Sequence, residues 1–166
     1  MGRIRNALRA YALDSDDPAA VLTRLDDMVC HFEPDEMATV LYAVFDPERR
    51  RMTVSVAGHP LPLITSPTAD AQLIDALADP PIGSAATEPR RATEVTVTES
   101  ATIYFFTDGV VERRGEDIDV GLERLREAAI PGPPQRGCTR IVSELLGDAQ
   151  PDDDAAVLAV HIRAPG

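Results

Sequence analysis

Apolar residues recur at helical spacing in the first part of the chain and predict two helices there. One face of segment 2–13 is apolar, and the opposite face carries arginines. The apolar face holds Ile4, Leu8 and Tyr11. A second helix is predicted to start with Asp16 or Asp17 as its N-cap and Pro18 in its first turn, and to end before Pro34. Its apolar stripe consists of Val21, Leu22, Leu25, Met28, Val29 and Phe32.

After Met37 the apolar period changes to two, which predicts strands. Segment 40–45 is apolar on both faces and is expected to be a buried central strand. Segment 52–56 alternates apolar and polar residues, which indicates a half-buried antiparallel partner. Further strands are predicted at 61–65, 73–77, 95–97, 101–106 and 155–162.

Helical spacing returns in the last third of the chain. One predicted helix contains Leu122, Leu125 and Ala129, and the next contains Ile141, Val142, Leu145 and Leu146. The breaker run 131–134 separates them. Helices, then strands, then helices and a return strand indicate an α+β layered fold. With no repeat and no dividing linker, one domain is expected over residues 1–166.

Composition limits the compartment and the partners. No apolar run approaches the roughly 18–20 residues that cross a bilayer, and no leader opens the chain, so we expect a cytoplasmic protein with no membrane partner. Its 16 basic residues, all arginine, face 28 acidic ones, and the net charge of -12 makes nucleic acid a poor partner. The pairs Arg90-Arg91 and Arg113-Arg114 are candidates for steering an acidic or phosphorylated partner, with solvated surface charge as the default interpretation.

The two cysteines, Cys30 and Cys138, form no CxxC pair. Both fall within apolar helical patterns, so they are expected to be buried free thiols. A disulfide would require an oxidising compartment, which nothing in the sequence indicates.

Two acidic turns are candidates for chemistry because each lies at the end of an apolar strand. The first follows strand 101–106 and reads Thr107-Asp108-Gly109; the second is the triplet Asp152-Asp153-Asp154 before the last strand. Carboxylates held at strand ends suit hard divalent cations, which prefer oxygen ligands. Each turn alone is more often ordinary surface structure. The triplet alone would also fit an unrelated calcium-binding domain, although no loop of alternating oxygen ligands supports that hypothesis.

Four sequence blocks occur in the order and spacing of one known family. They are Met37-Ala38-Thr39-Val40-Leu41-Tyr42 leading to Ala57-Gly58-His59-Pro60-Leu61-Pro62-Leu63; Pro81-Ile82-Gly83; Tyr104-Phe105-Phe106-Thr107-Asp108-Gly109-Val110-Val111-Glu112-Arg113; and Asp153-Asp154-Ala155-Ala156-Val157-Leu158. In these blocks the chain resembles the type 2C metal-dependent protein phosphatases (the PPM family), in particular the bacterial SpoIIE/RsbU-like branch. The resemblance covers almost the whole chain.

The resemblance implies an α-β-β-α layered sandwich of antiparallel sheets, with two Mn²⁺ or Mg²⁺ ions at one edge. In that family the ions hold and acidify a water that attacks the phosphorus of phosphoserine or phosphothreonine. Asp108 matches the metal-binding aspartate of the Asp-Gly motif, and Asp153 matches that of the final acidic motif. Asp154 is expected to add charge behind the ligands, with the register among Asp152, Asp153 and Asp154 open by one position.

The residues beside these ligands have expected roles of their own. Gly109 is expected to allow a tight turn through a positive φ. Glu112 is expected to cap the following turn or face solvent rather than bind metal. His59 is a candidate general acid for the leaving serine oxygen, but its place after Gly58 in a turn favours packing or hydrogen bonding. Gly58 and Gly83 are expected to support the metal site or to serve loop geometry.

The chain departs from the family at its beginning. The family places an Asp-x-x-Gly-His-Gly motif, whose aspartate bridges both metals, before the helix that segment 2–13 resembles, and this sequence has no counterpart. We therefore expect a SpoIIE-like domain that is incomplete at the N-terminus, with exposed strand edges and apolar faces. The parent chain is expected to be longer, with room for sensory or kinase domains.

The predicted function is a metal-dependent protein serine/threonine phosphatase. Its substrate is expected to be a phosphorylated regulatory protein, such as an anti-sigma-factor antagonist in sigma-factor partner switching. The missing motif supports a second hypothesis, a non-catalytic phosphatase domain that binds signalling proteins through its helical face. For this chain alone we expect weak activity or none.

Overall fold

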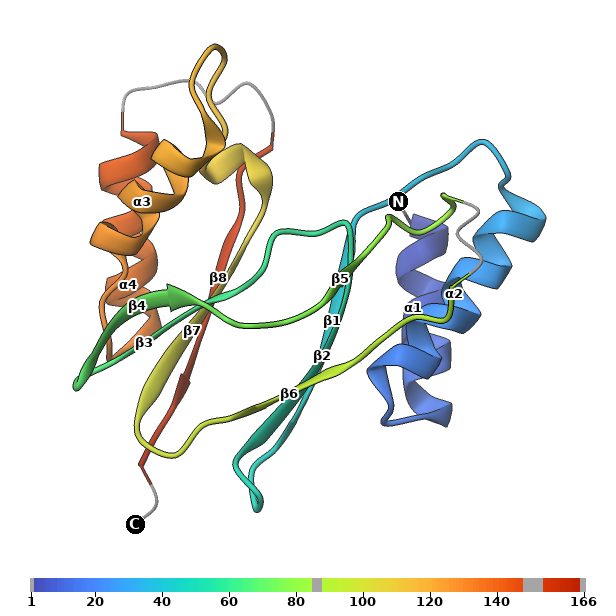
Figure 1. Ribbon diagram of the computed structural model, residues 1–166, viewed down its shortest axis with the longest axis horizontal. Helices are drawn as coiled ribbons and strands as arrows, with labels where there is room; N and C mark the ends of the chain where they lie inside the picture. Colours follow the sequence, from blue (N-terminus) through green and yellow to red (C-terminus); the bar gives the residue numbers. More distant parts are fainter. Residues whose placement is uncertain (1, 85–87, 148–153, 165–166) are drawn as a thin grey trace. The chain divides into compact units, whose positions relative to one another are not determined.

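The computed structural model describes residues 2–84, 88–147 and 154–164. The chain divides into two compact units. Unit 1 consists of Met1–His59 and Asp75–Thr96, and unit 2 of Pro60–Ile74 and Val97–Gly166. Each unit combines a β-sheet with helices (Figure 1).

The helices of unit 1 form where the apolar spacing predicts them. Helix α1 spans Gly2–Asp14 and helix α2 spans Pro18–Phe32. Asp17 is the N-cap of α2, and its side chain accepts a hydrogen bond from the backbone N–H of Ala19 at 3.0 Å. The buried face of α2 holds Val21, Leu22, Leu25 and Val29. Phe32 was predicted to extend this face but is 70% exposed, because it is the last residue of the helix.

Strand β2 (Arg51–Ala57) organises the sheet of unit 1. On one side β2 pairs antiparallel with β1 (Val40–Asp46). On its other side it pairs antiparallel with β6 (Thr93–Thr96) and parallel with β5 (Ala78–Asp79). The prediction of a buried central strand at 40–45 is therefore wrong: within the described residues β1 is an edge strand with half-buried side chains. An apolar pattern on both faces does not reveal how many neighbours a strand has.

The core of unit 1 lies between α2 and the sheet. Its buried members are Leu22, Leu25, Val29, Ala57 and Ile82. Helix α1 packs on this cluster through Ile4, Ala7, Leu8 and Tyr11, which confirms its predicted apolar face. Burying such side chains stabilises the unit by roughly 1.5–3 kcal/mol each.

Unit 2 contains an antiparallel sheet in the order β4-β3-β7-β8. The strands are β3 (Leu63–Ser66), β4 (Ala69–Leu73), β7 (Ala101–Phe106) and β8 (Val157–Ile162). The strand predicted at 73–77 is wrong, because the turn after Ser66 starts β4 at Ala69 and pairs Leu73 with Leu63.

Helices α3 (Ile118–Ala128) and α4 (Pro134–Ile141) pack on this sheet. Helix α4 continues into a π-helical turn, η2 (Val142–Leu146). Val142 was predicted to belong to the apolar stripe but is 47% exposed. The core consists of Leu63, Tyr104, Phe106, Val110, Val111, Leu125, Ala128, Ala129, Ile141 and Leu145.

Tyr104 is the largest fully buried side chain of unit 2. Its hydroxyl donates a hydrogen bond to the carbonyl of Ile130 at 2.6 Å. Burial raises the pKa of Tyr104. Gly137 of α4 lies directly over the ring: a Cβ at this position would stand 1.8 Å from the Tyr104 hydroxyl oxygen.

The α+β fold with antiparallel sheets is confirmed, with β2–β5 as a short parallel pair. Both cysteines are free. Cys138 is half-buried, but Cys30 is exposed, so its predicted burial is wrong: it falls beside the buried stripe of α2 rather than within it. Among the described helices, none has the length and apolar character needed to cross a membrane.

Candidate metal centre at the Asp108 turn

Asp108 lies where the buried strand β7 ends and the chain turns sharply. Thr107 is extended, and a 3₁₀ turn, η1, follows over Asp108–Val110. The carbonyl of Asp108 accepts hydrogen bonds from the N–H groups of Val111 at 2.9 Å and Glu112 at 2.7 Å. Two bonds on one carbonyl fix the backbone from which the Asp108 side chain projects.

Thr107 ties this turn to the start of the last strand. Its hydroxyl donates to the carbonyl of Asp154 at 3.0 Å and accepts from the N–H of Ala156 at 2.9 Å. Its own N–H donates to the Ala156 carbonyl at 3.1 Å. The turn carrying Asp108 and the chain at Asp154 are therefore adjacent, and the predicted meeting of the two carboxylates stays a prediction. Asp152 and Asp153 lie outside the described residues.

Gly109 plays a different role from the predicted one. It is the middle residue of the right-handed 3₁₀ turn and is buried, so the predicted positive φ is wrong. The Asp108 carboxylate accepts a hydrogen bond through Oδ1 from the Gly109 N–H at 2.9 Å. Glu112 is exposed, as expected.

Arg113 is not the solvated surface charge that the sequence suggested. Its guanidinium donates to the carbonyls of Gly109 at 3.2 Å, Glu112 at 2.7 Å and Leu145 at 2.6 Å. Three backbone acceptors on one half-buried side chain indicate a structural task. Arg114, next in sequence, is exposed.

Unit 1 contains the predicted Gly58, His59 and Gly83. Gly58 has φ +69°, and a Cβ there would stand 2.6 Å from the ring of Pro81. Gly83 has φ +81°, and a Cβ there would stand 2.2 Å from the carbonyl oxygen of Glu36. Both positions therefore require glycine on steric grounds. His59 is half-buried, and a catalytic role for it stays a prediction.

A buried ion pair in unit 1 was missed at the sequence level. Arg90 donates to the carboxylate of Asp26 in α2 through Nη2 at 2.6 Å and Nε at 3.2 Å, and also to the carbonyls of Pro80 and Pro81. The same carboxylate accepts from the Gly83 N–H at 2.7 Å. Arg90 therefore anchors the loop before Gly83 to α2 instead of facing solvent.

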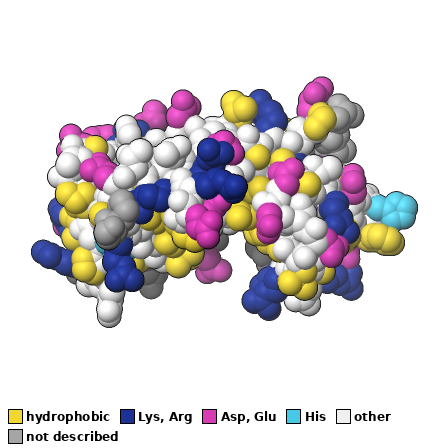
Figure 2. Space-filling model, turned by 90° about the horizontal axis from the view of Figure 1, so that it is seen from below, with side chains coloured by type: hydrophobic (Ala, Val, Ile, Leu, Met, Phe, Trp, Pro, Cys, Tyr) yellow, Lys and Arg dark blue, Asp and Glu magenta, His cyan; other side chains and the backbone are white. Residues whose placement is uncertain are grey.

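The other arginines are also largely engaged with acidic neighbours. Arg91 bonds the buried carboxylate of Asp79 at 2.7 Å, and Arg124 makes a forked pair with Glu116. In the face shown in Figure 2, basic side chains lie interspersed with acidic ones. Because most of these arginines pair with nearby carboxylates, two neighbouring arginines in the sequence do not by themselves predict a basic surface that steers an acidic partner.

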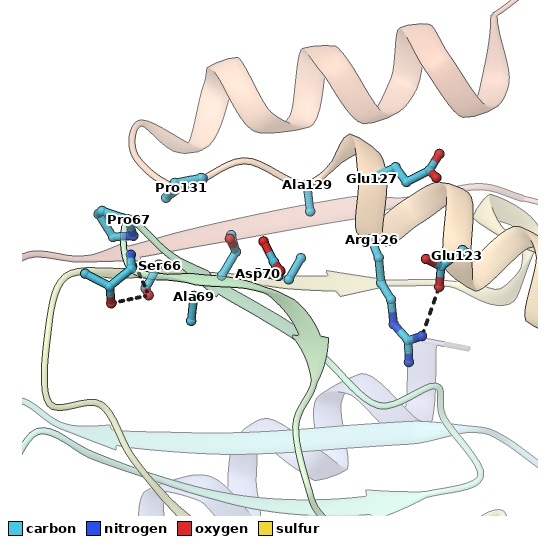
Figure 3. A pocket seen from close by; sticks show the side chains of 12 residues that line it. Ser66, Pro67, Ala69, Asp70, Glu123, Arg126, Glu127, Ala129 and Pro131 are labelled. Carbon is cyan, nitrogen blue, oxygen red and sulfur yellow. Dashed lines mark hydrogen bonds and ion pairs between the residues drawn. The ribbon is translucent and has the colours of Figure 1, made fainter.

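A pocket in unit 2 lies between the β3–β4 hairpin and α3 (Figure 3). Its volume is about 760 Å³, and its polar lining includes Asp70, Arg126 and the hydroxyl groups of Ser66 and Thr68. Hydrogen bonds from Thr68 and Ser66 lower the pKa of Glu99 and brace the hairpin. Neither Asp108 nor Asp154 lines this pocket.

The donor chemistry of Asp108 suits a hard cation. The carboxylate is exposed, and within the described residues its Oδ2 has no assigned hydrogen-bond or ion-pair partner. Groups of three or more His, Cys, Asp or Glu side chains able to hold an ion are absent from the described parts of the chain. An exposed carboxylate on a rigid strand end nevertheless fits Mn²⁺ or Mg²⁺, which take oxygen ligands.

Solved structures share this architecture. The RsbU and RsbW domains of Rv1364c from Mycobacterium tuberculosis align with a TM-score of 0.87 and 24% identity, over 100% of this chain and 48% of that one. The PP2C phosphatase domain with a regulatory-domain fragment of SpoIIE from Bacillus subtilis aligns with a TM-score of 0.80 and 15% identity, over 95% and 48%. The catalytic domain of the serine/threonine phosphatase PstP, solved with two manganese ions, gives 0.67 and 14%, over 97% and 81%.

These likenesses show that the fold is that of a PP2C-type phosphatase domain. The chain spans about half the length of the first two structures. Residues 1–163 match the family model of the stage II sporulation protein E, SpoIIE. The chain belongs to the SpoIIE family.

Proposed function

We propose that the chain is part of a metal-dependent protein serine/threonine phosphatase. The observation that carries the proposal is the junction between Thr107 and Asp154, where an exposed aspartate at the end of β7 lies beside the chain that leaves the acidic triplet. The family membership and the manganese ions of PstP support the same activity.

Asp108 and Asp153 are the proposed ligands of Mn²⁺ or Mg²⁺, with Asp152 or Asp154 as the register alternatives. When bound, the metal supplies a water acidified for attack on phosphorus and neutralises charge on the phosphate oxygens. The chain itself contributes rigidity: β7 and the doubly accepting Asp108 carbonyl hold the carboxylate in place before any ion arrives. Further ligands are proposed to come from an Asp-x-x-Gly-His-Gly motif in a longer parent chain.

The proposed substrate is a phosphorylated regulatory protein. The similar RsbU and RsbW domains belong to one protein, which supports a role in partner switching and an anti-sigma-factor antagonist as the phosphoprotein. We place the protein in the cytoplasm, with sensory or kinase domains elsewhere in the parent chain.

The proposal is tested by Mn²⁺-dependent phosphate release from a phosphoserine peptide, using the longer parent chain with its Asp-x-x-Gly-His-Gly motif after removal of metal with a chelator. Asp108→Asn is expected to lower the rate about 100-fold or more, since even groups that only support metal ligands are worth roughly 10–100-fold. Asp75→Asn, which removes an exposed carboxylate outside the turn, is the control.

Unchanged activity of Asp108→Asn would show that Asp108 is not a ligand. If the longer parent chain neither binds Mn²⁺ by calorimetry nor releases phosphate, the function is that of a non-catalytic module that binds signalling proteins.

A further inference from the structure

Arg113 connects two segments that lie far apart in the sequence. Through Nη1 it donates to the carbonyl of Gly109, inside the Asp108 turn, and to that of Glu112, just after the turn. Through Nη2 it donates to the carbonyl of Leu145 in the π-helical turn η2. One guanidinium therefore holds the backbone that follows Asp108 against the end of the α4–η2 helix.

The acceptor at Leu145 has a physical reason to attract a cation. The last carbonyls of a helix lack a partner within the helix and carry partial negative charge. Leu145 is the penultimate residue of η2, and its carbonyl lies at this negative end. A planar guanidinium satisfies several such acceptors in fixed directions, which an ammonium group does not.

The Asp108 turn has a second tie on its other side, the hydroxyl of Thr107. Between these ties, the carbonyl of Asp108 accepts from Val111 and Glu112. Glu112 thus donates its N–H to Asp108 and offers its own carbonyl to Arg113. Removing the guanidinium frees one side of the turn while the Thr107 side stays bound.

We infer that Arg113 is a positioning residue for Asp108: it fixes the direction of the proposed metal ligand by tying its turn to the end of α4–η2. The inference rests on the proposed function for the identity of Asp108 as a ligand. It assigns Arg113 no contact with substrate or metal.

The test compares Arg113→Met, which keeps the aliphatic stem and removes all donors, with Arg113→Lys and with Arg136→Met. Arg136 is an exposed arginine of α4, so its replacement matches the charge change. Amide hydrogen exchange is measured at Val111 and Glu112, whose N–H groups report the Asp108 turn, and at Ile103 of β7 as the core reference. Mn²⁺-induced broadening of the amide signals at residues 107–112 reports the ligand itself.

Arg113→Met is expected to speed exchange at Val111 and Glu112 about tenfold relative to Ile103, the size expected for lost hydrogen bonds to a charged group. Mn²⁺ affinity at the turn is expected to fall about 10–100-fold. Arg113→Lys should recover only part of either loss, and Arg136→Met should change neither.

Equal exchange in Arg113→Met and Arg136→Met, or a rise at Ile103 as large as that at Glu112, would overturn the positioning role whatever happens with Mn²⁺. Absence of Mn²⁺ broadening in the native chain would instead count against the metal ligand at Asp108, and the exchange comparison would still decide the role of Arg113.

Discussion

Replacing Arg90 with methionine is expected to destabilise unit 1 by about 3–5 kcal/mol, the usual cost of breaking a buried ion pair from one side. The Arg90 side chain is 2% exposed and that of Asp26 is 13% exposed, so water replaces little of the lost interaction. The variant leaves the Asp26 carboxylate with the Gly83 N–H and the Cys30 thiol as its donors and leaves the carbonyls of Pro80 and Pro81 without their charged donor.

Urea unfolding followed by circular dichroism gives the change in the free energy of unfolding. The matched control is Arg51→Met, because the pair of Arg51 and Glu94 has an N–O distance of 2.9 Å but side chains that are 43% and 59% exposed. An exposed pair of this kind contributes about 0–1 kcal/mol. The double variant Asp26→Leu/Arg90→Met should cost less than the sum of the single changes, since no unpaired charge then remains buried.

A loss in Arg90→Met no greater than that in Arg51→Met would refute this reasoning. It would mean that water or a local rearrangement solvates Asp26 once Arg90 is gone. A double variant as unstable as the sum of the two single variants would show that packing, rather than charge pairing, dominates at this position.

Two further predictions concern unit 2. Gly121→Ala should lower the free energy of unfolding of unit 2 by about 1–3 kcal/mol in urea, because the new Cβ would stand 1.9 Å from the Val111 carbonyl oxygen. Alanine normally favours a helix over glycine, so a gain in stability would contradict this close packing. Because burial raises the pKa of Tyr104, this phenol should ionise above its ordinary value of 10.0 in an absorbance titration from which Tyr104→Phe is subtracted. The contribution of the neutral Tyr104 phenol to the free energy of unfolding is fully present below pH 10.0 and is lost as the pH rises through the folded-state pKa. Ionisation of Tyr104 at or below pH 10.0 would contradict this prediction.

The helices and the strand β7 could be predicted because their patterns are local. Asp17 and Pro18 start α2, and the apolar spacing selects its buried face. The edge position of β1 in its sheet and the first residue of β4 could not be predicted, because both depend on pairing with strands that are distant in sequence. Periodicity describes the faces of a strand but does not identify its neighbours.

The candidate site was predictable to the same limited extent. Asp108 was selected by its motif, and its neighbour Thr107 bonds to Asp154, but the role of Asp108 as a metal ligand stays a prediction. The roles of Arg90 and Arg113 were missed because a run of two arginines looks the same whether the side chains meet solvent, a carboxylate or backbone carbonyls. Asp26 gave no signal in the sequence, since one acidic residue on an amphipathic helix is ordinary.

The ties at Leu145 and Asp154 also affect conformational entropy. Both fasten distant segments to one turn, so the entropy of bringing Leu145 and Asp154 to the Asp108 turn is lost when unit 2 folds rather than when an ion binds. Closure cost rises only with the logarithm of length, by about 0.6 kcal/mol per doubling. An ion that bound at Asp108 would therefore not have to bring Leu145 or Asp154 to this turn.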